Sequence, residues 1–530
     1  MKITRKRFSC FRINLSTLIF LYFLFHHSSV FSQNIEWEIS LGGSSDDYNY
    51  SICQTLDSGY LVVGYTSSND GDVVGFHPGN CSTAYCFDTW VVKLSTVGNI
   101  EWSKSLGGSM MDIGRSVSLS GSGYLIAGIT FSNDGDVSGN HGSSDAWIVK
   151  LDSVGGIIWQ KCIGGSEGDG FESIVELADH SIVAFGATYS NDIWVQGNHG
   201  DEDFWLVKLD SSANVIWQHC YGGSTRESPF SMKQTSDGGY VLCGFTDSND
   251  GQPNIPLGRD KQYWVVKTDS TGDMLWNNNF GGSRDDWCTD AVETNDKGFI
   301  LTGFAESIDY DVTNRHDNLA ADGWVVKIDS MGNLIWQHAM GGTDGDEFYS
   351  ILQAEDSSFV TVGFTMSNDD DVSGNHSSAQ DNWLVQFSEL GVIQSQKCFG
   401  SPYGDECKKV IQTIDHGLAL CSNTYGPGFD VSNFHGGNTD FWVAKLGSII
   451  NSIPETSLEG ITFFPNPASD FIYTEKVLIP QSINIYSLSG EMIKHFELKF
   501  QNEKLDISDL VPGVYFLRTE DGAVSKLLKY

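Results

Sequence analysis

The chain of 530 residues contains 58 glycines but only 11 prolines, a composition typical of many short strands joined by turns rather than of long helices. Its 31 lysines and arginines are outnumbered by 68 aspartates and glutamates, which gives a formal net charge of −37 at pH 7. This imbalance argues against a surface for nucleic acid or anionic membranes, and it favours cations, basic partners or simple solubility.

Residues 1–32 have the parts of a secretory signal peptide. The run "LSTLIFLYFLF" is apolar but too short to span a bilayer comfortably, and Val30 and Ser32 suit the last positions before a cleavage site. The basic region before that run consists of Lys2, Arg5, Lys6, Arg7 and Arg12. We therefore expect cleavage after Ser32 and an exported mature protein. No later stretch is apolar enough to predict a transmembrane segment.

One sequence unit then recurs down most of the chain. Aligned on the pattern D-x-W-x-V-K, its tryptophans follow one another at intervals of 57 to 60 residues, at Trp90, Trp147, Trp205, Trp264, Trp324, Trp383 and Trp442. Alternation and turn signals predict four strands per unit, for example "SIVELA", "SIVAFGATY", "DFWLVKLD" and "NVIWQHCYG". Tight Asp- and Gly-rich turns join these strands in pairs, so each unit is predicted to be a small antiparallel sheet.

The arrangement of these units predicts a closed ring. Predicted fourth strands begin at Ile35, Ile100, Ile157, Val215, Met274, Leu334 and Ile393. The last unit has no fourth strand of its own, and the strand at Ile35 has no unit before it, so this strand can complete the last sheet and remove an exposed edge. The sequence therefore predicts a seven-bladed β-propeller over residues 34–448, closed by its N-terminal strand.

The cysteines of an exported protein are candidates for oxidation. Cys81 and Cys86 lie in "CSTAYC", an insertion in the first unit, and predict a small disulfide-closed loop. Cys162, Cys220 and Cys398 share one register in different units and are predicted to be buried thiols. No zinc-type spacing occurs.

The motif "DxWxVKLDxxGxxxWxxxxGGS", followed by "SNDGDV", resembles the SBBP-type bacterial β-propeller repeat over nearly the whole of this region. The resemblance implies the fold but no common catalytic residues. Most tryptophans lie in third or fourth strands and are predicted to pack between blades. Trp194 and Trp287 break the pattern and are the candidates for ligand contact.

The long loops are expected on one face of the ring, together with the segments that join blades, and they concentrate carboxylates there. Two interpretations of these carboxylates stay open. They either bind Ca²⁺, the one cofactor that the motifs suggest, or cap turns locally and keep the loops soluble, which we favour. The residues concerned are Asp70, Asp72, Asp134, Asp136, Asp369 and Asp371.

A histidine recurs in six of the long loops, at His77, His141, His199, His316, His376 and His435. A histidine beside a carboxylate can serve a metal or a general base. An active site normally breaks symmetry, however, so a residue copied into nearly every unit is predicted to hold the loop instead.

The repeat ends near Ser448. Residues 449–459 are predicted to be a linker, and seven short strands in residues 460–530 predict a small Ig-like β-sandwich. The segments "FFPNPASD", "INIYSLSGEMIK" and "LDISDLVPGVYFLRTEDGAVSKLLKY" resemble the C-terminal sorting domain, type A, of the bacterial type IX (Por) secretion system. Its motif falls on Pro465, Asn466, Pro467, Gly490, Gly513 and Tyr515. The resemblance implies the type IX machinery as partner and the outer surface of a Gram-negative cell, or the medium, as destination.

These features favour a secreted or cell-surface binding module whose ligand, a glycan, a protein or a cation, stays open. The alternative is a secreted enzyme that acts on glycans or other extracellular polymers through the loop-rich acidic face. No G-x-S-x-G, HExxH or P-loop motif supports catalysis.

Overall fold

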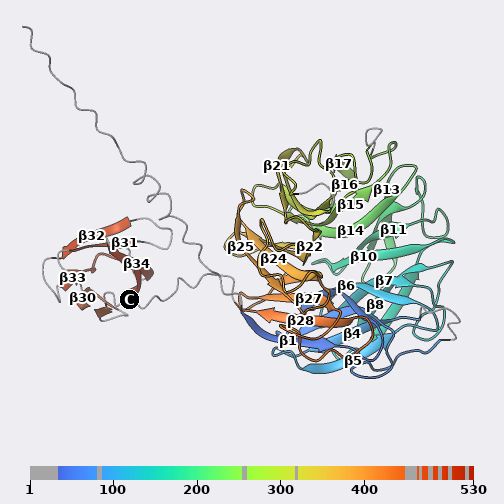
Figure 1. Ribbon diagram of the computed structural model, residues 1–530, viewed down its shortest axis with the longest axis horizontal. Coiled ribbons are helices and arrows are strands. Elements are labelled where there is room, and N and C mark those ends of the chain that lie inside the picture. The colour runs from blue at the N-terminus through green and yellow to red at the C-terminus, as the bar shows by residue number, and fades with distance from the viewer. Residues whose placement is uncertain are drawn as a thin grey trace, which may run out of the picture. The chain divides into compact units, whose positions relative to one another are not determined.

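The computed structural model divides into two compact units. It describes residues 34–79, 86–253, 259–316 and 320–447 of the first unit, and 462–464, 468–475, 481–486, 492–498, 504–511, 513–519 and 524–529 of the second. Every element in these residues is a β-strand, which confirms the all-β prediction (Figure 1). No helix in the described part is long and apolar enough to cross a membrane. The predicted signal peptide and linker lie outside the described residues.

Seven four-stranded antiparallel sheets, blades 1 to 7, are formed by the described residues of the first unit. Their first strands, termed inner strands, are β2 (Asp47–Gln54), β6 (Asp112–Ser120), β10 (Asp169–Glu176), β14 (Glu227–Gln234), β18 (Asp286–Glu293), β22 (Asp346–Gln353) and β26 (Asp405–Gln412). The second strands are β3 (Tyr60–Thr66), β7 (Gly123–Thr130), β11 (Ile182–Thr188), β15 (Tyr240–Thr246), β19 (Phe299–Ala305), β23 (Phe359–Thr365) and β27 (Leu418–Thr424).

The third strands are β4 (Asp88–Leu94), β8 (Asp145–Leu151), β12 (Asp203–Leu209), β16 (Gln262–Thr268), β20 (Asp322–Ile328), β24 (Asp381–Phe387) and β28 (Asp440–Leu446). The fourth strands are β5 (Ile100–Leu106), β9 (Ile157–Ile163), β13 (Val215–Tyr221), β17 (Met274–Phe280), β21 (Leu334–Met340), β25 (Ile393–Phe399) and, for blade 7, β1 (Ile35–Leu41).

The blades form a ring, because each inner strand contacts the inner strand of the next blade and β26 contacts β2. In Figure 1 the inner strands β6, β10, β14 and β22 lie toward the middle of this unit. The third-strand tryptophans pack between blades as predicted: the ring of Trp264 in blade 4, for instance, lies 4.5 Å from that of Phe204 in blade 3, and its side chain is fully buried. The free thiols of Cys162, Cys220 and Cys398 are buried as well.

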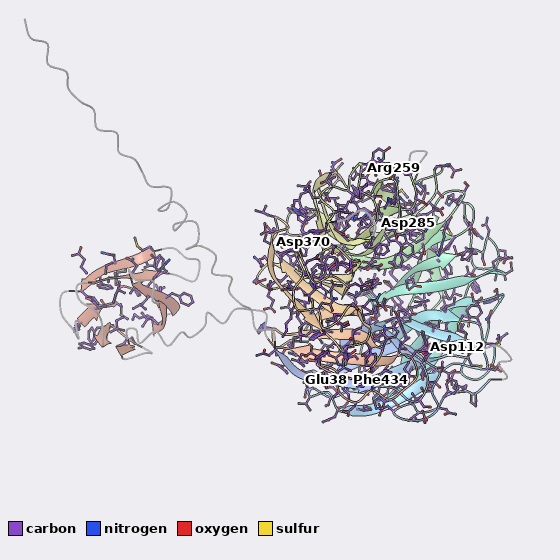
Figure 2. All side chains as sticks on the ribbon, viewed as in Figure 1. Glu38, Asp112, Arg259, Asp285, Asp370 and Phe434 are labelled. Atoms are coloured by element: carbon purple, nitrogen blue, oxygen red, sulfur yellow. The ribbon has the colours of Figure 1, made fainter. Side chains whose placement is uncertain are left out.

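The N-terminal strand β1 pairs with β28 from Ile35 opposite Leu446 to Leu41 opposite Phe441. A side-chain hydrogen bond between the third and fourth strands of other blades recurs here. In blades 2, 3, 5 and 6 the indole nitrogen of the third-strand tryptophan donates to a glutamine of the fourth strand, as Trp147 does to Gln160 at 2.9 Å. In blade 7 Trp442 donates to Glu38 of β1, also at 2.9 Å (Glu38 is labelled in Figure 2).

Each inner strand carries a β-bulge after its third residue, which leaves the fourth residue out of register with the second strand. In blade 3 the bulge lies between Phe171 and Ser173 and releases Glu172. The second strand passes so close that a Cβ on Gly186 would lie 1.9 Å from the carbonyl oxygen of Gly170. Six of the seven second strands have a glycine at this place, which allows the close approach, and blade 7 keeps the bulge with Ser422 there.

The second unit, described by itself, contains a three-stranded and a four-stranded sheet. The first sheet consists of β29 (Thr462–Phe464), β30 (Phe471–Glu475) and β33 (Lys504–Asp506), and the second of β31 (Gln481–Tyr486), β32 (Met492–Leu498), β34 (Gly513–Thr519) and β35 (Val524–Lys529). Ile472 and Leu505 from one sheet share an apolar core with Ile483, Leu517 and Leu527 from the other. The Ig-like assignment itself stays a prediction.

Candidate ligand-binding cavity

Hydrogen bonds fix the acidic loops, which belong to the face of the ring where the long loops were expected. The first carboxylate of each predicted calcium pair accepts a bond from the backbone of the segment before the inner strand: Asp70 from Ser44 N at 2.7 Å, and Asp134 and Asp369 in the same way. These bonds lower the pKa of all three carboxyl groups. Such contacts are those of turn capping. No group of three or more potential metal ligands occurs among the described residues, and calcium binding stays a prediction.

The recurring histidines link neighbouring blades. In six blades the histidine Nδ1 lies 2.5 to 3.0 Å from the carboxylate that opens the third strand, as between His435 and Asp440. In blade 4 both residues of this pair are replaced: Arg259 stands for the histidine and donates a hydrogen bond to Gln262, which stands for the aspartate. The other ring nitrogen often faces the second aspartate of the next blade, and His435 thereby reaches Asp72 at 3.5 Å across the closure of the ring.

The same contact explains the remaining predicted calcium residues. Asp136 lies 3.9 Å from the Nε2 atom of His77, and Asp371 lies 3.5 Å from that of His316. A histidine held between two carboxylates positions loops, so its recurrence has a structural reason. Arg259 and Asp370, labelled in Figure 2, mark two of these long loops.

One expectation about this face is wrong. The inner strands begin earlier than predicted: in blade 3 the strand starts at Asp169 rather than at Ser173. The last acid of each joining segment is therefore a buried strand residue instead of part of an exposed mouth. The seven such acids are Asp47, Asp112, Asp169, Glu227, Asp286, Asp346 and Asp405.

These buried acids each accept hydrogen bonds from a backbone amide and nearby hydroxyl groups. The carboxylate of Asp47, for example, accepts bonds from Gly43 N at 2.8 Å and Ser68 Oγ at 2.9 Å. Burial raises the pKa of Asp47 and of Asp405 to about 7, and that of Asp112 to about 6. Alternation of apolar residues could not reveal them, because they are polar residues with internal partners.

The two tryptophans singled out in the sequence occupy different places. Trp194 lies on the long loop of blade 3, is 40% exposed, and donates a hydrogen bond from its indole nitrogen to His141 of blade 2 at 3.3 Å. Trp287 lies on β18, next to the bulge, and stacks with Phe245 at 4.7 Å. Trp287 lines the central cavity, and Trp194 is not among the residues that line it.

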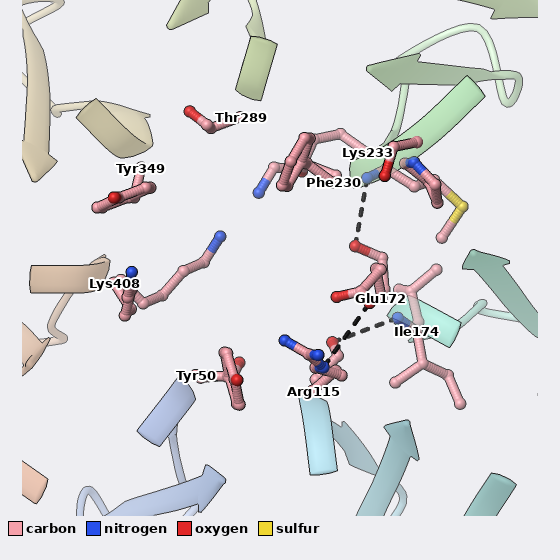
Figure 3. A pocket seen from close by; sticks show the side chains of 18 of the residues that line it. Tyr50, Arg115, Glu172, Ile174, Phe230, Lys233, Thr289, Tyr349 and Lys408 are labelled. Atoms are coloured by element: carbon pink, nitrogen blue, oxygen red, sulfur yellow. Dashed lines mark hydrogen bonds and ion pairs between the residues drawn. The ribbon is translucent and has the colours of Figure 1, made fainter. Parts of the chain in front are cut away.

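The central cavity has a volume of about 690 Å³ and lies where the inner strands converge. Its size is within the range of small-molecule sites. The bulge residue of every blade contributes to its wall, namely Tyr50, Arg115, Glu172, Phe230, Thr289, Tyr349 and Lys408 (Figure 3). The bulges described above thus aim one side chain per blade at a common space.

The bulge position differs chemically from blade to blade, although its neighbours repeat. The residue just after it is a serine in five of seven blades: Ser51, Ser116, Ser173, Ser231 and Ser350. These serines connect inner strands, as when Ser173 Oγ accepts a bond from Met232 N at 3.3 Å. The residues that connect neighbouring blades are therefore largely repeated, whereas the bulge residues differ. Together they give the cavity wall an asymmetric set of aromatic, cationic, acidic and hydroxyl side chains.

Charges on the wall form local pairs with aromatic neighbours. The Arg115 guanidinium lies 4.2 Å from the ring centroid of Tyr50 and 3.7 Å from Glu172. Lys408 lies 3.8 Å from the ring centroid of Tyr349. Nε of Arg115 is buried and has no hydrogen-bond partner among the described residues.

Two glutamates beside the cavity are held in different states. Burial raises the pKa of Glu347 to about 7. Burial alone would also raise the pKa of Glu406, but the Lys408 ammonium, 2.6 Å away, keeps it below its ordinary value. The hydroxyl of Tyr349 lies 2.7 Å from Glu347 and 3.1 Å from Glu406 and so connects the two carboxyl groups.

Two blades replace the connecting serine by a charged residue. Asp290 takes this place in blade 5 and Lys409 in blade 7. Lys233 and Lys409 each approach a different oxygen of Asp290 at 3.2 Å. Burial alone would raise the pKa of Asp290, but the two ammonium groups hold it well below its usual range.

The sorting motif is partly described. Gly513 begins β34, and Tyr515 is buried, with its hydroxyl donating to the carbonyl oxygen of Val511 at 2.8 Å. The other motif residues, Pro465, Asn466, Pro467 and Gly490, lie outside the described residues, as does Cys81. Cys86 is disulfide-bonded.

Comparison with known families assigns the C-terminal segment. Residues 462–529 match the family model described as "Secretion system C-terminal sorting domain". This confirms the resemblance to the Por sorting domain: the chain carries the export signal of the type IX secretion system and is destined for the cell surface or the extracellular space.

Other similarities are distant. The regulatory protein FlaEY of Caulobacter vibrioides is 26% identical over 150 residues, which cover 27% of this chain and 15% of that protein, so the chain spans only a small part of this relative. Among solved structures, PorZ of Porphyromonas gingivalis, a surface component of the type IX secretion system, has 10% identity and a TM-score of 0.42, with 93% of this chain and 60% of that chain covered. The WD40 domain of Neurospora crassa Pan2 has 8% identity and a TM-score of 0.43, with 77% and 95% covered. Structural likeness at this level does not transfer a function.

Proposed function

We propose that this exported protein is a binding module of the cell surface or extracellular space and that its ligand occupies the central cavity. The observation that carries the proposal is the asymmetry of the bulge residues. Seven copies of one strand keep the buried acid at its start and vary the residue aimed at the cavity, from Tyr50 to Arg115 to Lys408. A wall of aromatic and polar groups around a preformed hollow is typical of ligand sites.

Screening the mature protein against arrayed oligosaccharides and peptides tests the proposal. A ligand of the cavity should lose at least about tenfold in affinity when Tyr349 is replaced by Ala, because an aromatic platform is removed. The matched control is Trp194→Ala, which changes an exposed aromatic residue outside the cavity. A ligand that depends on Trp194 and not on Tyr349 would place the site on the loops and contradict the proposal.

A second candidate function is hydrolysis of an extracellular glycan, and the Glu347–Glu406 pair favours it. Glycoside hydrolysis uses one protonated and one ionised carboxyl group, and the pKa values of Glu347 and Glu406 are shifted in these two directions, although Tyr349 bridges the pair and neither glutamate is among the residues that line the cavity. Release of reducing ends from polysaccharides by the native protein, and its loss with unchanged binding in Glu406→Gln, would support catalysis. Binding without turnover by the native protein would exclude hydrolysis of the bound glycan and leave binding as the proposed function.

A further inference from the structure

The central cavity gathers positive charge in a strongly acidic protein. Among the residues that line it, the cationic ones are Arg115, Arg226, Lys233, Lys408 and Lys409, and the acidic ones are Glu172 and Glu202. The whole chain has a formal charge of −37, so this concentration of cations is local. None of the five is copied from blade to blade, which means that the repeat does not require them.

Most of these cations have a carboxylate of their own. Arg115 pairs with Glu172, and Arg226 pairs with Glu202 at 2.5 Å. Lys408 pairs with Glu406. The pairing makes these positions nearly neutral, so they do not by themselves attract an anion.

The lysine pair at Asp290 is different, because two cations share one carboxylate. That carboxylate also accepts bonds from Ser231 Oγ at 2.6 Å and from Ile351 N at 3.2 Å, so its acceptor capacity is largely used. Each ammonium has three donors, and Asp290 is the one carboxylate within salt-bridge distance of either lysine among the described residues. Asp290 is 1% exposed, whereas the side chains of Lys233 and Lys409 are 36% and 26% exposed and line the cavity.

From this surplus charge, the spare donors and the aromatic wall, we infer that the cavity binds a carboxylate-bearing sugar whose acid group lies between Lys233 and Lys409. The inference rests on the proposed function and names its ligand class. Tyr50, Phe230 and Tyr349 contribute aromatic rings to the wall, those of Tyr50 and Tyr349 with Arg115 and Lys408 over one face, and the wall serines and Thr289 add hydroxyl groups (Figure 3). A short chain with one acidic sugar is favoured over a polyanion, since the acidic protein repels a long polyanion at a distance.

Matched trisaccharides test the charge requirement on the mature full-length protein. Sialyllactose is compared with its uncharged methyl ester, and a glucuronate-terminated trisaccharide with its glucose-terminated counterpart, by calorimetry. We expect at least about tenfold tighter binding for one acidic member over its neutral partner, because a charged contact is made in a desolvated site. The two pairs distinguish sialic from uronic acids as the source of the carboxylate.

The repeat itself provides the variants. Lys409→Ser restores the residue of five other blades, and Lys233→Val restores the valine found in blades 3 and 5. We expect Lys409→Ser to remove most of the preference for the acidic sugar, so that its affinity falls toward that of the neutral sugar. The double variant Asp290→Ser/Lys409→Ser rebuilds the serine position in both blades without an unpaired buried carboxylate, and its unfolding midpoint controls for folding.

The outcomes distinguish failure of the carboxylate inference from failure of the proposed binding function. Equal affinity for acidic and neutral sugars, with both lost in Tyr349→Ala, overturns the carboxylate inference and leaves the cavity as a binding site. Acidic sugars that bind equally well to Lys409→Ser and Lys233→Val overturn it as well. If none of the four sugars binds, the inference is wrong, and the array screen with Tyr349→Ala decides on the proposed function.

Discussion

Closure of the ring by β1 makes a sharp stability prediction. Leu41 ends β1, is fully buried, and packs in the apolar cluster that includes Val92 and Val443. Replacement by Ala removes three carbons from a packed site and is expected to cost about 2 to 5 kcal/mol of unfolding free energy. Ile163 holds the same place in the fourth strand of blade 2 and is also fully buried, so Ile163→Ala is the matched control.

The two variants differ in one respect: Ile163 directly follows the other three strands of its blade in the chain, whereas Leu41 precedes the other three strands of its blade by six whole blades. If β1 belongs to the cooperative fold, both replacements lower the urea midpoint by similar amounts. Tryptophan fluorescence is the appropriate signal, because all 15 tryptophans lie between Trp37 and Trp442 and none lies in the sorting domain. A normal midpoint for Leu41→Ala beside a lowered one for Ile163→Ala would refute closure by β1.

Further predictions concern single contacts, pH, metal and export. Trp90 has a buried indole nitrogen with no hydrogen-bond partner in the described part of the chain, and Ser103 holds the place of the glutamine in other blades, so Ser103→Gln should raise the unfolding free energy by about 1 kcal/mol in urea titration. Burial raises the pKa of Asp405 from 3.8 to about 7, so the stability that the protonated carboxyl group contributes is fully present below pH 4 and is lost as the pH rises through 7. The melting temperature should therefore fall between pH 5 and pH 8.5, and it should fall less in Asp405→Asn. Chelation should shift the melting temperature by no more than about 2 °C, because the loop carboxylates already have partners, and a larger drop reversed by calcium would instead establish a metal site. A chain that ends at Ser448 should stay folded in the periplasm while the intact chain reaches the surface, and equal delivery of both in cell fractionation would contradict the sorting role.

Much of the ring could be predicted from the sequence, because the repeat of 57 to 60 residues marks each blade and the alternation of apolar residues marks the strands within it. The fourth strands begin where expected, at Ile100 and Leu334 for example, since a tight turn precedes each of them and apolar residues alternate within it. The third strands were recognisable from an invariant tryptophan with apolar residues on both sides. Such signals are local, and tertiary context does not override them.

The inner strands were harder to predict for a physical reason. Their first residue is a buried acid, such as Asp169, which resembles a loop residue until its hydrogen-bond partners are known. Their bulge then adds one residue to the alternation, so the side chain that enters the cavity cannot be identified by counting in twos. A comparison of the seven copies would have found the position, because Tyr50, Arg115 and Glu172 occupy one column that otherwise has no common chemistry.

The bulge also explains how the ring tolerates such variety. A residue at this position makes no register pair with the second strand, and its side chain lines the cavity. Exchange of Glu172 or Lys408 therefore keeps the apolar packing between blades and removes contacts along the wall, namely those with Arg115 and Tyr349. The residues on either side of it lack that freedom: Phe171 packs against Trp205, and Ser173 bonds to the next inner strand. Repetition secures the scaffold, and one unpaired position per blade is left for recognition. It follows that new ligand specificities on this scaffold are reached by substitutions at the seven bulge positions at smaller cost in stability than by substitutions one residue away.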